Sequence, residues 1–219
     1  NQFELLIDGP EFFPRMLQAI GRAESQVDLE LYLVEAGACA EAVVDALEQA
    51  ALRGVRVRCL FDDYGSLAFS SALRERLTTA GVYLRWYNRL RWRRGLRNLY
   101  RDHRKLLLVD ERWAVVGGTG VTDEFWVPGE ASSEWHEVMV YLQGPIVADW
   151  QMLFDRQWHA NQRRPAWRPP ADFGLPRLPP LPPPGEGTGR VARPAARPHT
   201  DTLPAPPRRA PGRGREQVS

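Results

Sequence analysis

Apolar and polar residues alternate with two different periods along the first 90 positions of the chain. Runs in which apolar residues tend to occupy every second position predict β-strands at 3–7, 27–34, 55–61 and 82–87. Between these runs, apolar residues recur every three or four positions, which predicts helices from Phe13 to about Gly21, at 38–53 and at 70–80. This succession predicts an α/β fold in which helices pack against a largely parallel or mixed sheet, with right-handed crossovers.

The pattern between 105 and 161 predicts three more strands and one more helix. The strands are expected at 105–109, 113–116 and 137–142, with turns at 110–112 and 117–120 and a loop at 124–133. Pro145 suits the first turn of a helix. The N–H groups of that turn have no partner within the helix, and proline has no backbone N–H group. This last helix is expected to reach about Asn161.

The composition changes sharply after residue 162. Residues 163–219 contain 15 of the 19 prolines and 11 arginines against four acids, a local net charge of +7, which leaves −5 on residues 1–162. No apolar period is present there. We therefore predict a folded domain at 1–162 and a disordered or polyproline II tail at 163–219. A docking site for a proline-binding module and an out-of-frame extension are two further interpretations of this tail.

Several features that mark particular classes of protein are missing from this sequence. Cys39 and Cys59 are too few for a disulfide framework and are expected to be buried thiols in a reducing compartment. No run of 18 apolar residues predicts a membrane-spanning helix, and no stretch reads as a signal peptide. No histidine or cysteine cluster has metal-ligand spacing, so we expect no metal and no other cofactor. Asp62 and Asp63 are instead expected to cap the loop that follows them.

The chain has 28 arginines and a single lysine, Lys105, two positions after His103. A lysine kept where every other basic position is arginine indicates a site shaped around a compact ammonium group. Residues i and i+2 of a strand point to the same face, so His103 and Lys105 are expected to face one reaction centre. There the ammonium can hold a phosphate oxygen while the imidazole attacks phosphorus. Leu106 and Leu108 would pack into the core from the opposite face.

The spacing H-x-K-x4-D, from His103 to Asp110, resembles the signature of the phospholipase D superfamily. Residues 2–160 look like the N-terminal half of bacterial cardiolipin synthases. The stretches that carry this likeness are Leu29-Glu30-Leu31-Tyr32, Arg53-Gly54-Val55-Arg56-Val57, Asp62-Asp63-Tyr64-Gly65-Ser66, Ala80-Gly81-Val82, His103-Arg104-Lys105, Val116-Gly117-Gly118 and Gly144-Pro145-Ile146-Val147. The resemblance implies one half-unit of a phospholipase D-like fold, a mixed β-sheet flanked by helices on both faces.

The same resemblance implies roles for particular residues. His103 would be the nucleophile or its acid counterpart, Lys105 would bind phosphate, Glu137 would orient the histidine, and Asp110 would act more through structure than chemistry. We assign four further residues to substrate binding: Gly118, Thr119, Arg104 and Glu30. One position departs from the family pattern, because Gly120 stands where an asparagine is usual. The amide donor is therefore missing unless Thr119 or Thr122 replaces it.

The family's site joins two such motifs, so that one histidine attacks and the other protonates the leaving oxygen. The other histidines of this chain are His136, His159 and His199, and none lies in an H-x-K sequence. We interpret His136 and His159 as structural. A complete site therefore needs a second half outside this sequence or a homodimer that pairs two copies of His103.

Residues 85–105 hold nine basic residues and one acid, interleaved with four aromatic residues. Three interpretations remain open: contact with anionic lipid headgroups, with Leu90 and Trp92 entering the interface, binding of a nucleic acid backbone, or a solvated loop that pairs with the acidic body. The position just before His103 favours a role with substrate.

The leading functional hypothesis is a phosphatidyltransferase of cardiolipin synthase type that acts through a phosphohistidine. It would take an anionic, phosphatidylglycerol-like phospholipid at the cytoplasmic face of the bacterial inner membrane, as a peripheral protein, and nucleic acid is not expected as a partner. One alternative is a homodimeric single-motif phosphodiesterase or nuclease. Another is a truncated or degenerate module that only binds anionic lipid.

Overall fold

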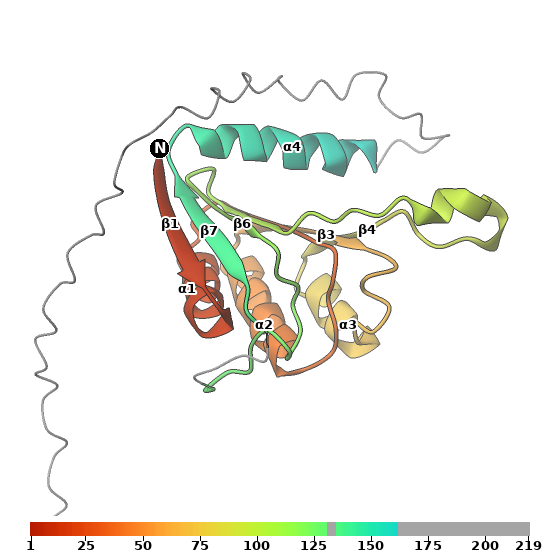
Figure 1. Ribbon diagram of the computed structural model, residues 1–219, viewed down its shortest axis with the longest axis horizontal. Coiled ribbons are helices and arrows are strands. Elements are labelled where there is room, and N and C mark those ends of the chain that lie inside the picture. Colours follow the sequence, from red (N-terminus) through yellow and green to blue (C-terminus); the bar gives the residue numbers. More distant parts are fainter. Residues whose placement is uncertain (131–134, 162–219) are drawn as a thin grey trace, which may run out of the picture. The chain divides into compact units, whose positions relative to one another are not determined.

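The computed structural model describes residues 1–130 and 135–161, which fall within one compact unit (Figure 1). For residues 92–94 it describes the backbone alone. The predicted tail at 163–219 lies outside the described residues, and the domain boundary at 162 remains a prediction.

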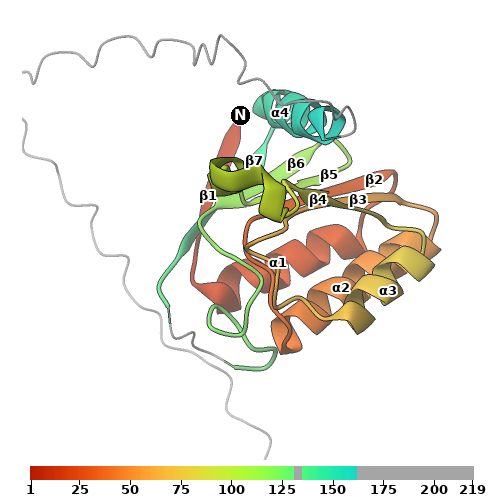
Figure 2. The same ribbon diagram turned by 90° about the vertical axis from the view of Figure 1, so that its right-hand side faces the viewer.

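In the described residues, seven strands form one mixed sheet (Figure 2). Strands β2, β3 and β4 are parallel, and every other neighbouring pair is antiparallel. The mixed α/β sheet confirms the predicted fold class. One feature was not predicted: β1 lies beside β7, at the edge away from β4, and not next to β2. Across the sheet the order is β1 (Gln2–Ile7), β7 (Val138–Gln143), β6 (Trp113–Gly117), β5 (Leu106–Val109), β2 (Gln26–Leu31), β3 (Arg56–Asp62) and β4 (Tyr83–Tyr87).

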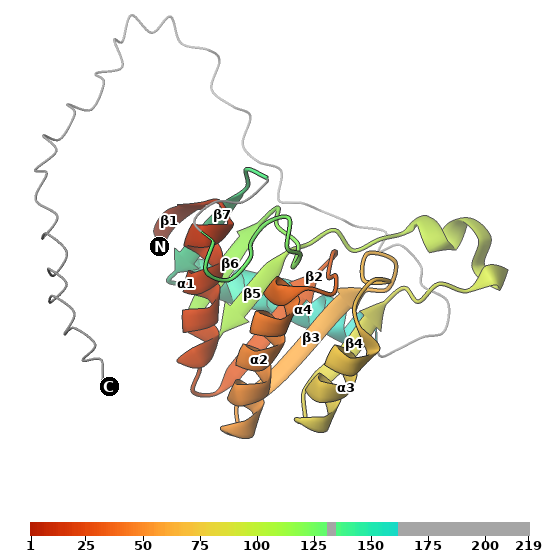
Figure 3. The ribbon, with the colours of Figure 1, turned by 90° about the horizontal axis from the view of Figure 1, so that it is seen from below.

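Helices cover both faces of the sheet, as the sequence predicted. One face carries α1 (Gly9–Gly21), α2 (Ala38–Leu52) and α3 (Ser71–Thr79), and the other carries α4 (Ile146–Ala160) (Figure 3). The start of α3 is capped by Ser70, whose hydroxyl accepts a hydrogen bond from the Ala72 N–H at 3.2 Å. Gly54 follows α2 with a φ of 89°, a left-handed conformation in which a side chain would be strained.

Two apolar clusters result, one on each face. The larger lies between the sheet and α1–α3, and it contains Cys39 and Cys59, both buried and unpaired as predicted. The smaller lies under α4, where Phe154 and Trp158 pack on Leu106 and Leu108. Because each fully buried side chain of this size contributes about 1.5–3 kcal/mol, both faces of the sheet stabilise the fold.

Strand β2 lies at the centre and is buried on both faces, although the sequence predicted only one apolar face. Its polar side chains, Asp28 and Glu30, point toward the α4 face and are fully buried. Asp28 is compensated by two contacts of 2.6 Å from the Arg58 guanidinium and by a 2.8 Å hydrogen bond from the Gln151 side-chain amide. Buried charge is tolerated here because it is paired and hydrogen-bonded.

Candidate active site

His103 and Lys105 lie in the extended segment that leads into β5, and their side chains meet. The Lys105 Nζ lies 2.8 Å from Nδ1 of His103, 3.4 Å from Nε2 and 3.0 Å from the His103 carbonyl oxygen. The Gly117 N–H donates to the Lys105 carbonyl at 3.4 Å, which ties this segment to the end of β6. The imidazole is exposed, whereas Lys105 is only 7% exposed. The two side chains therefore lie on the same side of the segment, as the sequence predicted.

The electrostatic environment of Lys105 favours an anionic ligand. Burial lowers the pKa of Lys105, and the negative charges of Glu137 and Asp102 act in the opposite direction. An ammonium group that has lost part of its hydration recovers stabilisation from a bound anion. A phosphate oxygen at this position would supply that charge.

Tyr32 forms a third side of the site, a role that the sequence analysis did not assign to it. Its ring centroid lies 4.5 Å from that of His103 at an interplanar angle of 39°, and Lys105 Nζ lies 5.3 Å from the same ring centroid. Tyr32 directly follows β2, which neighbours β5 in the sheet. The sequence carried no direct signal for this role, because the pairing of β2 with β5 is visible only in the fold.

Glu137 precedes β7 and packs against Gly118, so these two predicted residues are brought together. A Cβ atom on Gly118 would lie 2.4 Å from an oxygen of the Glu137 carboxylate, so a side chain at position 118 would displace that carboxylate. The carboxylate accepts a hydrogen bond from the Val138 N–H at 2.9 Å, and among the described residues it accepts none from His103. Its charge acts on Lys105 instead. Orientation of the histidine by Glu137 therefore remains a prediction.

Asp110 lies at the opposite end of β5 from His103. Its carboxylate accepts hydrogen bonds from the N–H groups of Glu24, Ser25 and Gln26 at 2.7–3.2 Å and from the Ser25 hydroxyl at 2.8 Å. Burial alone would raise the pKa of Asp110, but these hydrogen bonds outweigh it and lower the pKa below its ordinary value. Asp110 thus anchors the turn before β2 and does not approach the reacting groups.

Arg104 and Glu30 also lie away from His103 and Lys105. Because side chains alternate along the segment, Arg104 points to the α4 face, where its guanidinium lies 2.7 Å from Oε1 of Glu30 and 3.4 Å from Oδ1 of Asp102. Glu30 is fully buried. The structure therefore gives no support to direct substrate contact by these two residues, because the sheet separates them from the Lys105 ammonium.

Glu30 and Asp102 behave as a coupled carboxyl pair beside Arg104. Burial, followed by hydrogen bonding and repulsion from Asp102, raises the pKa of Glu30 to about 10. Burial also pushes the pKa of Asp102 upward, but hydrogen bonds from Glu30 and Arg104 outweigh it and lower that pKa. The proton therefore belongs to Glu30, and the negative charge that faces Arg104 belongs to Asp102.

Asp62, at the end of β3, fixes the chain just before the motif. Its carboxylate accepts hydrogen bonds from the Tyr64 and Gly65 N–H groups at 2.9 and 3.1 Å, which confirms the predicted loop cap for Asp62. Asp63, predicted to share this role, accepts from the Leu90 N–H instead. The Asp62 carboxylate also accepts from the Asp102 N–H at 2.9 Å and from the Arg101 guanidinium at 3.1 Å. Through these contacts, which the sequence did not reveal, Asp62 holds the residues that lead into His103.

The two threonines beside the glycine-rich turn are buried. Thr119 is buried and its hydroxyl donates to the Gly120 carbonyl at 2.9 Å, and Thr122 is buried as well. A Cβ atom on Gly120 would lie 2.8 Å from Cβ of Leu33. Leu33 therefore occupies the space that a side chain at position 120 would need. Replacement of the missing amide by either threonine therefore remains a prediction, as does contact of Thr119 with substrate.

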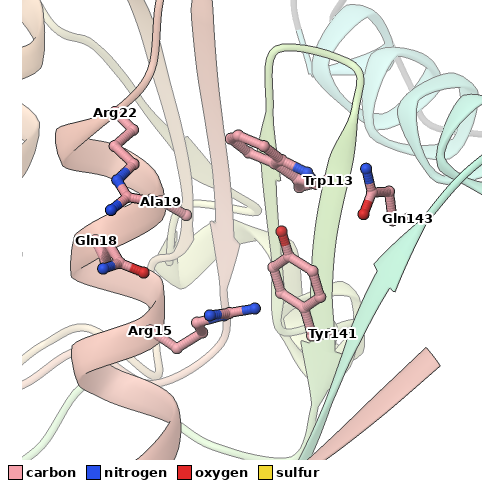
Figure 4. A pocket seen from close by; sticks show the side chains of 7 residues that line it. All are labelled: Arg15, Gln18, Ala19, Arg22, Trp113, Tyr141 and Gln143. Atoms are coloured by element: carbon pink, nitrogen blue, oxygen red, sulfur yellow. The ribbon is translucent and has the colours of Figure 1, made fainter. Parts of the chain in front are cut away.

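A pocket of about 240 Å³ lies elsewhere, between α1 and the strands β6 and β7 (Figure 4). Arg15, Trp113, Tyr141 and Gln143 are among the residues around it. Trp113 pairs with Val109 at the Asp110 end of β5, so this pocket is remote from His103. The Arg15 guanidinium already lies over the Tyr141 ring and pairs with Glu4 at 3.2 Å. This pocket contains none of the predicted site residues.

Comparison with known proteins agrees with the geometry. Residues 16–158 match the family model described as "Cardiolipin synthase, PLD-like domain". Cardiolipin synthase B of Salmonella typhimurium is 36% identical over 151 residues, which are 68% of this chain and 36% of that protein. The major cardiolipin synthase ClsA of Bacillus subtilis is 31% identical over 160 residues, 73% of this chain and 33% of that protein. The chain thus spans about a third of the length of these curated relatives.

Solved structures share the fold at lower sequence identity. NUC of Salmonella typhimurium, described as a phospholipase D family member, matches with a TM-score of 0.54 and 18% identity, over 72% of this chain and 94% of that one. Phosphatidylserine synthase of Haemophilus influenzae matches with a TM-score of 0.56 and 14% identity, over 72% of this chain and 36% of that one.

Proposed function

This chain belongs to the cardiolipin synthase family of phospholipase D-like domains, and on that premise we propose that it supplies one half of a phosphatidyltransferase site. In this proposal His103 forms a phosphohistidine intermediate and Lys105 holds a nonbridging oxygen of the phosphate. The observation that carries the proposal is the 2.8 Å contact between the Lys105 ammonium and the exposed His103 ring. A phosphate oxygen that replaces the imidazole as the partner of the ammonium places phosphorus within reach of the ring.

The reaction divides into two displacements. In the first, an imidazole nitrogen of His103 attacks phosphorus, an N–P bond forms, and the P–O bond to the leaving alcohol breaks. A second histidine, from outside this sequence, gives its proton to the leaving oxygen. In the second displacement, a hydroxyl group on the glycerol headgroup of another phospholipid attacks phosphorus and returns its proton to that second histidine, and the N–P bond breaks. Lys105 stabilises the negative charge on the nonbridging oxygens during both steps.

The second histidine requires a partner, and one face of the domain is suited to receive it. The register of β1 with β7 places Phe3, Leu5 and Ile7 on the α4 face of the sheet. Helix α4 packs on β5, β6 and β7, and Leu5 remains 64% exposed. We propose that a second phospholipase D unit, either another part of a longer protein or a second copy of this chain, covers this edge. An exposed apolar strand face is typical of an interface.

The proposed substrate is an anionic phospholipid of the phosphatidylglycerol type, because Lys105 selects a phosphate and the matched relatives are named as cardiolipin synthases. The proposed location is the cytoplasmic face of the bacterial inner membrane, with peripheral attachment. In the described part of the chain, no helix has both the length and the apolar character needed to cross a bilayer.

The test is direct detection of the covalent intermediate in the complete enzyme. After incubation with labelled phospholipid and rapid acid-free denaturation, mass spectrometry should find the phosphatidyl group on the His103 peptide. His103→Ala should abolish the adduct, whereas His136→Ala, a matched change at a 95% exposed histidine side chain, should leave it in place. An adduct that persists in His103→Ala would show that the nucleophile lies elsewhere.

The single H-x-K sequence also favours a second candidate, a homodimeric phosphodiesterase in which two copies of His103 meet. Analytical ultracentrifugation of the 219-residue chain separates the two candidates. A stable dimer supports the homodimer, and a monomer that gains activity only with a second half supports the transferase half-site.

A further inference from the structure

The connection between β4 and β5 projects away from the body of the domain (yellow-green in Figures 1 and 3). We call residues 88–101 the projection. Its outer part is a 3-10 helix, η1 (Trp92–Leu99), with a change of direction at Gly95. Leu96 is 81% exposed and Leu99 is 73% exposed, and Leu90 is exposed as well. These leucines therefore contribute little to the apolar clusters that hold the domain together.

Polar contacts between described residues brace the projection. At its base, the Asn88 side-chain amide donates to the carbonyl oxygens of Arg97 and Tyr100, both at 2.8 Å. Farther out, Asn98 accepts from the Arg91 N–H at 3.2 Å and donates to the Arg91 carbonyl at 2.8 Å. A segment braced in this way needs none of its leucines for folding.

The projection is also fastened to the loops around the candidate active site. The Leu90 N–H donates to Asp63 at 2.9 Å, and the Arg101 guanidinium donates to Asp62 at 3.1 Å and to the Asn88 carbonyl at 3.1 Å. Asp62 in turn holds the Asp102 N–H, one residue before His103. The base of the projection is thus fixed to the residues that lead into the His103–Lys105 pair.

Exposed cations surround the exposed leucines. Arg89, Arg91 and Arg97 all lie on the surface of the projection. Within the part of the chain that the structure describes, none of these three guanidinium groups forms an ion pair. Unpaired arginines beside exposed aliphatic side chains match the boundary of an anionic bilayer, where phosphates lie next to acyl chains. A nucleic acid would instead call for a row of flat stacking surfaces, whereas the two most exposed apolar side chains of the described projection are Leu96 and Leu99.

We propose that the projection is the membrane-contact element of this domain. Leu96 and Leu99 enter the boundary between headgroups and acyl chains, and the exposed arginines bind the lipid phosphates. The inference deepens the proposed function and rests on it, because it names the surface through which the half-site reaches an anionic phospholipid substrate. It explains why the residues that lead into His103 leave the body of the domain before they return to the sheet.

The test measures binding of the full 219-residue chain to vesicles of phosphatidylglycerol and phosphatidylethanolamine by co-sedimentation. The neutral double variant Leu96→Ser/Leu99→Ser should bind about tenfold more weakly, because about half of each leucine's transfer energy is lost without any change in charge. Leu52→Ser is the matched control, since Leu52 is 65% exposed on α2, and it should bind like the unmodified chain. All variants keep the arginine-rich residues 163–219, so the charge of that segment cancels from the comparison.

A second measurement reports insertion directly. Cys39 and Cys59 are buried, so a thiol-reactive, polarity-sensitive dye labels only the new cysteine of Leu96→Cys under native conditions. The emission of the dye on Leu96→Cys should shift to the blue when phosphatidylglycerol vesicles are added. The emission of the same dye on Leu52→Cys should not shift. The proposal is overturned if the double serine variant binds like the unmodified chain, if Leu52→Ser loses as much binding, or if a single-stranded oligonucleotide binds more tightly than the vesicles.

The same vesicle assay separates this inference from the proposed function. His103→Ala should bind vesicles like the unmodified chain, because the imidazole is not part of the projection. Loss of the covalent adduct without loss of vesicle binding therefore tests the chemistry. Loss of vesicle binding in Leu96→Ser/Leu99→Ser tests the projection. Each of the two proposals can therefore be contradicted while the other still holds.

Discussion

The guanidinium of Arg104 lies 2.7 Å from the buried carboxyl group of Glu30, on the face of the sheet opposite to the Lys105 ammonium. The residue between the two motif positions is therefore tied to the centre of the fold. Residues 103 and 105 face the proposed substrate, and residues 102 and 104 face α4. The segment that bears His103 and Lys105 on one face is thus held in register by a buried polar cluster on its other face.

This cluster should make the stability of the domain depend on pH. Glu30 keeps its proton in the folded state, where its pKa is about 10, and loses it in the unfolded state near the ordinary value of 4.5. Because the folded state binds more protons between these values, the free energy of unfolding should fall as the pH rises from about 5 to about 10. Glutamine cannot ionise, so Glu30→Gln should reduce the slope of the unfolding free energy against pH by up to about 1.4 kcal/mol per pH unit.

Urea unfolding at several pH values measures this effect. The variant should be close to the unmodified chain in stability near pH 5 and should exceed it increasingly toward pH 9. Glu48→Gln provides a control at a more exposed carboxylate, and it should leave the slope unchanged. Parallel stability curves for Glu30→Gln and the unmodified chain would contradict a protonated Glu30.

Asp110 should contribute to the stability of the fold and not to the chemical steps. Asp110→Ala leaves the N–H groups of Glu24, Ser25 and Gln26 without their acceptor, and we expect a loss of about 1–3 kcal/mol in the free energy of unfolding. At a temperature well below the melting transition, covalent adduct formation in the complete enzyme should fall far less than in His103→Ala. An equal loss of adduct in the two variants would place Asp110 in the catalytic machinery.

Lys105 should not tolerate arginine, despite the preference of this sequence for that residue. The side chain is 7% exposed and its ammonium fits between the His103 ring and Tyr32, where a planar guanidinium needs more room and more acceptors. We expect Lys105→Arg to slow adduct formation by at least about a hundredfold, which corresponds to about 2.7 kcal/mol. Arg112→Lys, a swap of the same kind at a 65% exposed side chain outside the projection, is the control and should retain the adduct. A Lys105→Arg variant of full activity would show that only charge matters at this position.

The sequence predicted most of the elements and the face on which the reactive pair lies, because both follow from local periodicity. It could not show the pairing of β1 with β7, since this depends on contacts between residues more than 130 positions apart. It also missed the burial of Glu30, whose partner Arg104 lies far along the chain. The projection escaped prediction as an ordered element because side-chain amides such as those of Asn88 and Asn98 shape it, and no apolar period marks such bonds.

Leu33 and Gly120 should be energetically coupled, because each occupies space that the other would need. A Cβ atom on Gly120 would lie 2.8 Å from Cβ and 3.0 Å from Cγ of Leu33. Gly120→Asn, which introduces the residue usual in the family, should therefore destabilise the domain by about 1–3 kcal/mol through overpacking. Leu33→Ala should relieve part of that cost, so the double variant should be more stable than the sum of the two single changes predicts.

A double-mutant cycle in urea measures this coupling, and it also tests the missing amide donor. If the shortened side chain of Leu33→Ala makes room for the asparagine, adduct formation in the complete enzyme should rise in the double variant relative to Leu33→Ala alone, because the amide then reaches the phosphate. Gly21→Asn is the control for a substitution at a helical glycine whose Cβ position is open. Strictly additive stabilities would mean that Leu33 shifts freely and does not explain why this chain carries glycine at position 120.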